Sequence, residues 1–170
     1  MNTKRLILGA CAFLPLLAIA GELPANTQVG ITLSVGQSGK AMKQQSAIVT
    51  RGSETRLGGT PVEYIRESNV DAQGQALAVK GTIFEGLSVI VSPIAILDDR
   101  VVVRVAVQER HVIKIDKLTI QGQTVDLPRT TLREASLGNT ILTYGSALDV
   151  PLDDLNSPTK YQLRLQAERP

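Results

Sequence analysis

The stretch from Gly86 to Gln108, GLSVIVSPIAILDDRVVVRVAVQ, decides the fold class of this chain. In its second half, apolar β-branched residues occupy every second position. The positions on one side are Val101, Val103, Val105 and Val107. A period of two residues is that of a β-strand with one buried face, and valine fits a pleated surface better than a helix. The pattern therefore predicts a strand whose valine side faces a core.

The first half of the stretch, Leu87 to Leu97, is apolar on both sides of the predicted strand. Such a segment is either buried on two faces or placed at an interface. Asp98-Asp99 separates the two halves, and a short acidic turn between two apolar runs is typical of a β-hairpin. We therefore predict a central hairpin.

The rest of the chain predicts further strands, separated by glycine, proline and small polar residues. They are Gln28–Val35, Ser46–Thr50, Val62–Arg66, Ala76–Glu85, Val112–Ile120, Thr124–Leu127 (ending at Pro128), Asn139–Tyr144 and Tyr161–Gln166. Glu54–Leu57 is the expected partner of Ser46–Thr50, Gly36–Gln45 is expected to be a turn or mobile loop, and Thr131–Leu137 fits a strand or a single helical turn.

No stretch shows an apolar repeat of 3.6 residues over eleven or more positions. The expected fold class is all-β: an antiparallel sheet or sandwich of short strands. It forms one domain over residues 21–170, which at about 150 residues is long enough to bury a core.

The first 20 residues have the pattern of a signal peptide. Lys4 and Arg5 precede the apolar run Leu6–Leu17, and Ala18-Ile19-Ala20 supplies small residues before an expected cleavage at Gly21. An uncleaved anchor is the alternative. Lipidation at Cys11 is a weaker one, because the apolar run continues well beyond that cysteine.

Charge and cysteine content limit the function of the exported chain. The full sequence has 18 basic and 16 acidic residues, and both basic residues of the first 20 leave with the signal peptide. The remaining charge is balanced, whereas binding of nucleic acid requires a basic surface. We expect no nucleic-acid partner. The single cysteine, Cys11, also leaves, so neither a disulfide nor thiol chemistry is expected.

Residues that could carry catalysis are scarce. Gly39-Lys40 resembles part of a phosphate-binding loop, but Ser34 replaces the first glycine and Ala41 the magnesium-binding hydroxyl. His111 is the only histidine, and one histidine without cysteine does not form a typical zinc site.

The paired acids Asp98-Asp99 and Asp153-Asp154 lie where turns are predicted, and aspartate caps turn amides. Nothing places two carboxylates across a cleft as glycoside hydrolysis requires. We therefore predict a non-enzymatic protein with no catalytic residue, cofactor or metal. The sequence alone does not identify binding residues.

The order of several short motifs resembles the β-domain of the secretin family, which forms the outer-membrane gates of type II and III secretion, type IV pili and filamentous phage export. The similarity covers about residues 45–150. The matching segments are Ala47–Gly52, Gly59–Tyr64, Gly86–Ile94, Asp98-Asp99 with the valine strand, Pro128, Arg133-Glu134 and Gly145–Val150. Pro151-Leu152 stands where the family has a glycine pair, and the family's following proline- and glycine-rich signature is absent.

The resemblance implies a component or accessory of a bacterial secretion or pilus-assembly system, in the periplasm or outer membrane of a Gram-negative bacterium. It also implies self-association or binding to a larger secretin, with contact to the outer membrane left open. The main alternative is a periplasmic β-sandwich binding module or chaperone that shares only the strand spacing. An exported hydrolase or hydrolase inhibitor is the weakest option.

Overall fold

The computed structural model describes residues 23–24, 27–37, 40–70, 72–73, 75–120 and 123–169. Within them the chain is all-β, which confirms the predicted fold class. The elements in chain order are β1 (Gln28–Gln37), β2 (Lys43–Thr50), β3 (Thr55–Val70), β4 (Ala76–Ile96), β5 (Arg100–Ile120), β6 (Gln123–Thr143), β7 (Ala147–Asp149), the 3-10 helix η1 (Asp153–Leu155) and β8 (Tyr161–Glu168).

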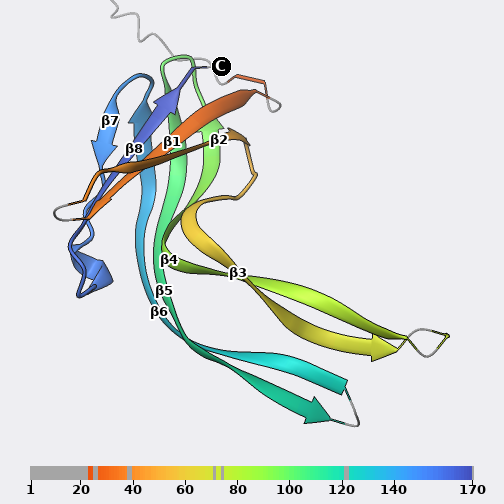
Figure 1. Ribbon diagram of the computed structural model, residues 1–170. Helices are drawn as coiled ribbons and strands as arrows, with labels where there is room; N and C mark the ends of the chain where they lie inside the picture. The colour runs from red at the N-terminus through yellow and green to blue at the C-terminus, as the bar shows by residue number, and fades with distance from the viewer. Residues whose placement is uncertain are drawn as a thin grey trace, which may run out of the picture.

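Two antiparallel four-stranded sheets pack into a sandwich (Figure 1). One sheet has the order β2-β1-β8-β7 and the other the order β3-β4-β5-β6. The four alternating valines of β5 are completely buried between them, as the period of two predicts. The other buried apolar residues of the core are Val29, Ile31, Leu33, Val49, Leu57, Leu87, Val89, Val91, Ile96, Leu142, Val150, Leu155, Leu163, Leu165 and Ala167.

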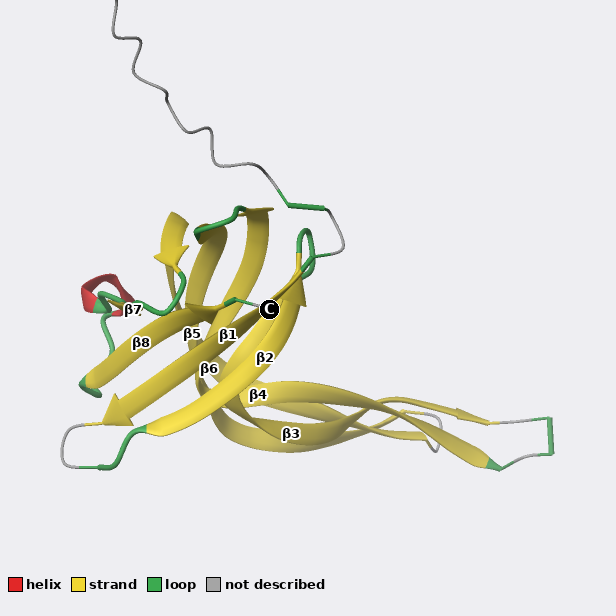
Figure 2. Cartoon of the chain, turned by 90° about the horizontal axis from the view of Figure 1, so that it is seen from above, coloured by secondary structure: helices red, strands yellow, loops and turns green. Residues whose placement is uncertain are grey.

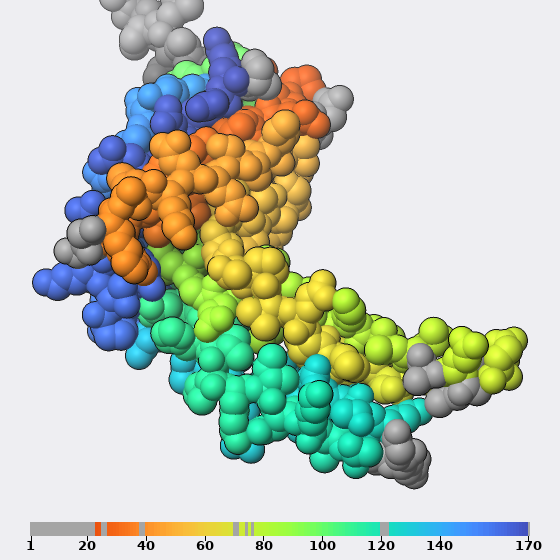
Figure 3. Space-filling view, in the orientation of Figure 1, coloured from red at the N-terminus to blue at the C-terminus, as the bar shows by residue number. Residues whose placement is uncertain are grey.

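The strands of the second sheet continue far beyond the sandwich and form a projecting arm (Figures 1 and 2). β4 and β5 pair only from Gly86 opposite Arg110 to Ile96 opposite Val101. Beyond Gly86 and Arg110, the β3–β4 and β5–β6 hairpins separate from each other, although β3 contacts β6 again through the Ile65 N–H, which donates to Asp126 Oδ2 at 2.7 Å. The arm is thus a pair of twisted hairpins, and Figure 3 shows it leaving the body of the molecule.

Glycines and bulges lie where the sheet bends into the arm. Gly86 has a φ of +89°, a conformation that favours glycine because it has no side chain. Register shifts occur in β3 between Gly58 and Thr60 and in β5 between Val112 and Lys114. Such β-bulges bend a strand and increase its twist. These local features explain why the sheet changes direction at this level.

Most strands are longer than predicted, and β4, β5 and β6 reach 21 residues each. The segments Thr124–Leu127, Thr131–Leu137 and Asn139–Tyr144 merge into β6, so the predicted end at Pro128 is wrong, and Thr131–Leu137 is strand rather than a helical turn. Within the part of the chain that the structure describes, β6 pairs only with β5. Proline lacks an N–H group, and an edge strand tolerates it because that donor is not needed by a second neighbour.

The expected pairing of Ser46–Thr50 with Glu54–Leu57 is also wrong. β2 pairs with β1, while β3 pairs with β4 in the other sheet. The Ser53 side chain explains the change of sheet, since its hydroxyl donates to the Thr50 carbonyl at 2.6 Å and accepts from the Thr50 N–H at 3.1 Å. This tight turn ends β2 and directs the chain across the sandwich.

Other predictions differ only in length or fall outside the described residues. The Asp98-Asp99 hairpin turn and the strand from Tyr161 are confirmed. The predicted loop Gly36–Gln45 is shorter in the structure, because β1 extends to Gln37 and β2 begins at Lys43. The predicted signal peptide, residues 1–20, lies outside the described residues.

Candidate functional site

The residues that the sequence singled out for chemistry do not come together. Asp98-Asp99 forms the β4–β5 turn, and Asp153-Asp154 belongs to η1. His111 is exposed on β5, with its Nδ1 atom 3.7 Å from Glu85 Oε1. Lys40 is exposed between β1 and β2, whereas Gly39 lies outside the described residues. No group of His, Cys, Asp or Glu side chains in the described ranges could hold a metal ion.

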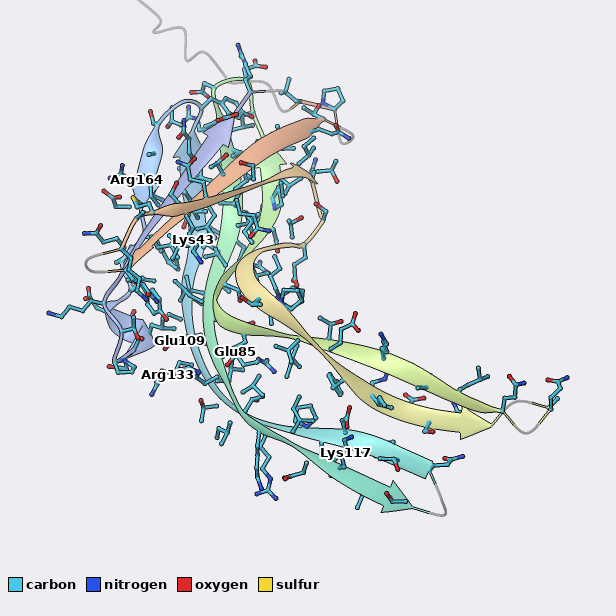
Figure 4. All side chains as sticks on the ribbon, viewed as in Figure 1. Lys43, Glu85, Glu109, Lys117, Arg133 and Arg164 are labelled. Carbon is cyan, nitrogen blue, oxygen red and sulfur yellow. The ribbon has the colours of Figure 1, made fainter. Side chains whose placement is uncertain are left out.

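A buried charge lies where β5 leaves the sandwich. Only 3% of Glu109 is exposed. Its Oε1 atom accepts a hydrogen bond from the Tyr161 hydroxyl at 2.9 Å, and its Oε2 atom lies 3.3 Å from Nη1 of Arg133 (Figure 4). Burial, followed by the hydrogen bond to Glu109, raises the pKa of Tyr161 above its usual value. The cluster joins β5 and β6 to β8, so it ties the two sheets together at the base of the arm.

The sequence pattern was sufficient to predict that Glu109 faces the core, because Glu109 continues the alternation of the buried valines after Val107. The sequence analysis missed it. Its partners come from residues far away in the chain, Arg133 on β6 and Tyr161 on β8. Because every member of the cluster already contacts another protein group, we assign the cluster a structural role.

A second polar cluster crosses the opposite face of the same sheet. Arg56 Nη1 donates to Ser88 Oγ at 2.7 Å and to Gln108 Oε1 at 2.9 Å, and Gln108 Nε2 donates to Glu134 Oε1 at 2.6 Å. The Arg56 guanidinium also lies 5.2 Å from the centre of the Phe84 ring. These contacts link β3, β4, β5 and β6 at the bend, and they stabilise the start of the arm.

The strongest candidate for a binding site is a cleft of about 500 Å³ between the two sheets. This volume lies within the range that is typical of ligand sites, roughly 300–1,000 Å³. Its apolar floor consists of Leu33, Val35 and Leu87. The remaining lining residues are Gln37, Lys40, Ala41, Lys43, Gln44, Gln45, Gly58, Gly59, Thr60, Glu85, Gly86 and Tyr161.

The bulge of β3 forms one wall of this cleft. Gly58 and Gly59 have φ values of +78° and +71°. A Cβ atom on Gly58 would lie 2.7 Å from the Leu87 carbonyl oxygen, so the position requires glycine for space as well as for conformation. The Gly58 N–H donates to Oε1 of Gln45, which reaches across from β2, at 2.6 Å. A backbone donor of β3 therefore points into the cleft.

Positive charge lies at the other wall. Lys40 lies between β1 and β2, and Lys43 is the first residue of β2. Both are exposed, and neither ammonium group forms an ion pair with a described residue. Among the described residues that line the cleft, Glu85 is the only acidic one. The cleft thus combines an apolar floor, a backbone donor and two cations. The sequence alone does not reveal this site, because its lining residues come from five strands and from the connection between β1 and β2.

Comparison with known proteins adds no relative: no family model, no curated protein and no solved structure matches this chain. The part of the chain that the structure describes contains no helix with the length and apolarity needed to span a membrane.

Proposed function

We propose that this chain is a non-enzymatic exported component of a bacterial secretion or pilus-assembly system, secretin-like in character, which works by associating with other subunits. The arm is the observation that carries this proposal. Among the described residues, none between Thr60 and Glu85 or between Arg110 and Leu132 is buried. A two-stranded hairpin without a packed face is only marginally stable in water. We therefore infer that a partner binds the arm and stabilises it.

Association of the arm with another subunit is better explained by its exposed apolar side chains than by backbone pairing at its strand edges. Apolar residues on the β5–β6 hairpin are exposed by 65% at Ile113, 40% at Leu118 and 47% at Leu127. Exposed apolar groups gathered in one region mark interaction surfaces. By contrast, the N–H of Ile65 on the β3 edge is already bound by Asp126 within the same molecule. We therefore assign the association to apolar side chains of the arm.

Most of the segments that carry the secretin resemblance lie together in one sheet. The segments Gly59–Tyr64 and Gly86–Ile94, and the valine strand, lie next to one another in the sheet β3-β4-β5-β6. Ala47–Gly52 is placed differently, because β2 belongs to the other sheet.

A periplasmic β-sandwich binding module or chaperone is the second candidate. The observation that favours it is the completeness of the sandwich, which buries its own core between two sheets and needs no neighbouring chain to close it. In this case the arm would act on a client protein, and the exported chain alone would be a monomer.

Light scattering on the exported chain, extracted gently from the cell envelope, distinguishes the two candidates. We expect an oligomer that the triple variant Ile113→Ser/Leu118→Ser/Leu127→Ser converts to a monomer with an unchanged far-ultraviolet circular dichroism spectrum. The matched control is Ile48→Ser, which removes an apolar side chain that is 70% exposed on β2 and should leave the oligomer intact. A wild-type chain that is monodisperse and monomeric without detergent refutes the assembly proposal.

A further inference from the structure

The cleft lies between two strands that each have a free edge there. Among the described residues, β2 pairs only with β1 and β3 pairs only with β4, so both are edge strands of their sheets. They contact each other without pairing. Edge strands present unpaired N–H and C=O groups, which makes them templates for an added strand. The wall of the cleft therefore offers backbone groups as well as side chains.

Gln45 occupies the position that a backbone carbonyl would take in such an added strand. A strand N–H normally donates to a carbonyl of a neighbouring strand. The Gly58 N–H instead donates to a side-chain amide oxygen at 2.6 Å, and Gln45 is itself exposed. An amide oxygen and a peptide carbonyl have the same acceptor chemistry. The glutamine side chain is therefore replaceable by the backbone of a bound peptide.

The floor and the two lysines define the side chains that such a peptide would carry. Leu33 is 1% and Leu87 is 7% exposed, so the floor is continuous with the core and favours an apolar side chain. Lys40 and Lys43 have no acidic partner among the described residues. In an extended peptide, successive side chains point to opposite sides. Alternating apolar and acidic residues would thus face the floor and the lysines.

We propose that this cleft binds an extended peptide segment with alternating apolar and acidic side chains, and that a peptide carbonyl displaces Gln45 from the Gly58 N–H. Strand addition of this kind takes affinity from main-chain hydrogen bonds and specificity from pockets for alternate side chains. The partner is a segment of another protein. This binding goes beyond the assembly proposed above, because none of the lining residues belongs to the exposed apolar set of the arm.

Fluorescence anisotropy of a labelled hexapeptide of alternating valine and aspartate tests the proposal on the exported chain. We expect saturable binding, with Lys40→Glu/Lys43→Glu weakening it by about tenfold or more, equivalent to about 1.4 kcal/mol. The matched control is Lys117→Glu, an exposed lysine on the β5–β6 hairpin far from Lys43 (Figure 4), which should change the affinity less than about twofold. The triple variant of the arm should bind the peptide as the wild type does.

Gln45→Ala provides the sharper test of displacement. Because it removes the side chain that competes for the Gly58 N–H, we expect it to strengthen peptide binding by about threefold, the scale of one modest hydrogen bond. In a ¹H–¹⁵N spectrum, the amide signal of Gly58 should shift during peptide titration. Weaker binding by Gln45→Ala, or a Gly58 signal that does not move, would contradict displacement.

Several outcomes overturn the proposal as a whole. They are an absence of binding up to about 1 mM peptide, equal binding of a hexapeptide of alternating valine and lysine, and binding of dodecanoate without binding of the peptide. The last outcome would assign the cleft to a lipid anion. Both lysines are exposed, so we expect the lysine variants to fold and to keep the circular dichroism spectrum of the wild type. An unchanged spectrum excludes misfolding as the reason for lost binding.

Discussion

Val103→Asp tests the assignment of the valine face to the core. Val103 is completely buried on β5 and pairs with Pro93 of β4 on one side and Thr140 of β6 on the other. The substitution removes apolar burial of about 1.5–3 kcal/mol. It also places an unpaired carboxylate in the core, so the total loss should exceed about 4 kcal/mol. Domains have a free energy of unfolding of only about 5–15 kcal/mol, and the variant should be largely unfolded or barely stable.

Urea unfolding followed by far-ultraviolet circular dichroism measures this loss. Val103→Ala gives a graded version, since two buried methyl groups at roughly 0.8 kcal/mol each, with a small cavity, predict a loss of about 2 kcal/mol. Arg104→Asp is the matched control, because Arg104 is the next residue and is exposed on the opposite face; its effect should stay within about 0.5 kcal/mol. Equal unfolding midpoints for Val103→Asp and the wild type would refute the reasoning.

Three further predictions concern charged groups. Arg133→Ala should lower the free energy of unfolding by about 2 kcal/mol, because it leaves the buried Glu109 without its cation, and adding Glu109→Gln should recover part of this loss in urea unfolding. The pKa of Tyr161 is raised by burial and by Glu109, so its contribution to stability is present below pH 10 and is lost as the pH rises through the folded-state value. The alkaline fall of the urea midpoint should therefore be smaller in Tyr161→Phe. A hydrogen bond from Lys114 lowers the pKa of Asp116 below its usual 3.8, and NMR titration of the carboxyl carbon should show this pKa return upward in Lys114→Ala.

The strand faces of this protein could be predicted from its sequence because burial and alternation have the same period. The buried side chains of β5 and of β8, such as Val105 and Leu165, are the ones that alternation selects. The ends of strands were less predictable. Proline and glycine usually end a strand, but Pro128 is tolerated at an edge and Gly58 within a bulge. The positions of proline and glycine predict neither which sheet a strand joins nor that the strands extend into an arm.

The candidate site was not predictable for a different reason. Lys43 and Gln45 on β2 and Gly58 on β3 meet only because β2 and β3 belong to different sheets. The sequence favoured pairing these segments in one hairpin, which would have left no cleft between them. The tight turn at Ser53 is the local feature that separates them, and a serine in a turn has too many common roles to predict a change of sheet.

The same two strands form the centre of the core and the longest part of the arm, so assembly and folding are linked in this chain. β4 and β5 run without interruption from buried Val89 and Val107 to the hairpins beyond Gly86 and Arg110. The Glu109 cluster lies at the transition and connects it to β8. A partner that binds and orders the arm stabilises the folded chain by mass action. Association should therefore raise the unfolding midpoint of the whole sandwich, with a dependence on protein concentration that the triple variant of the arm lacks.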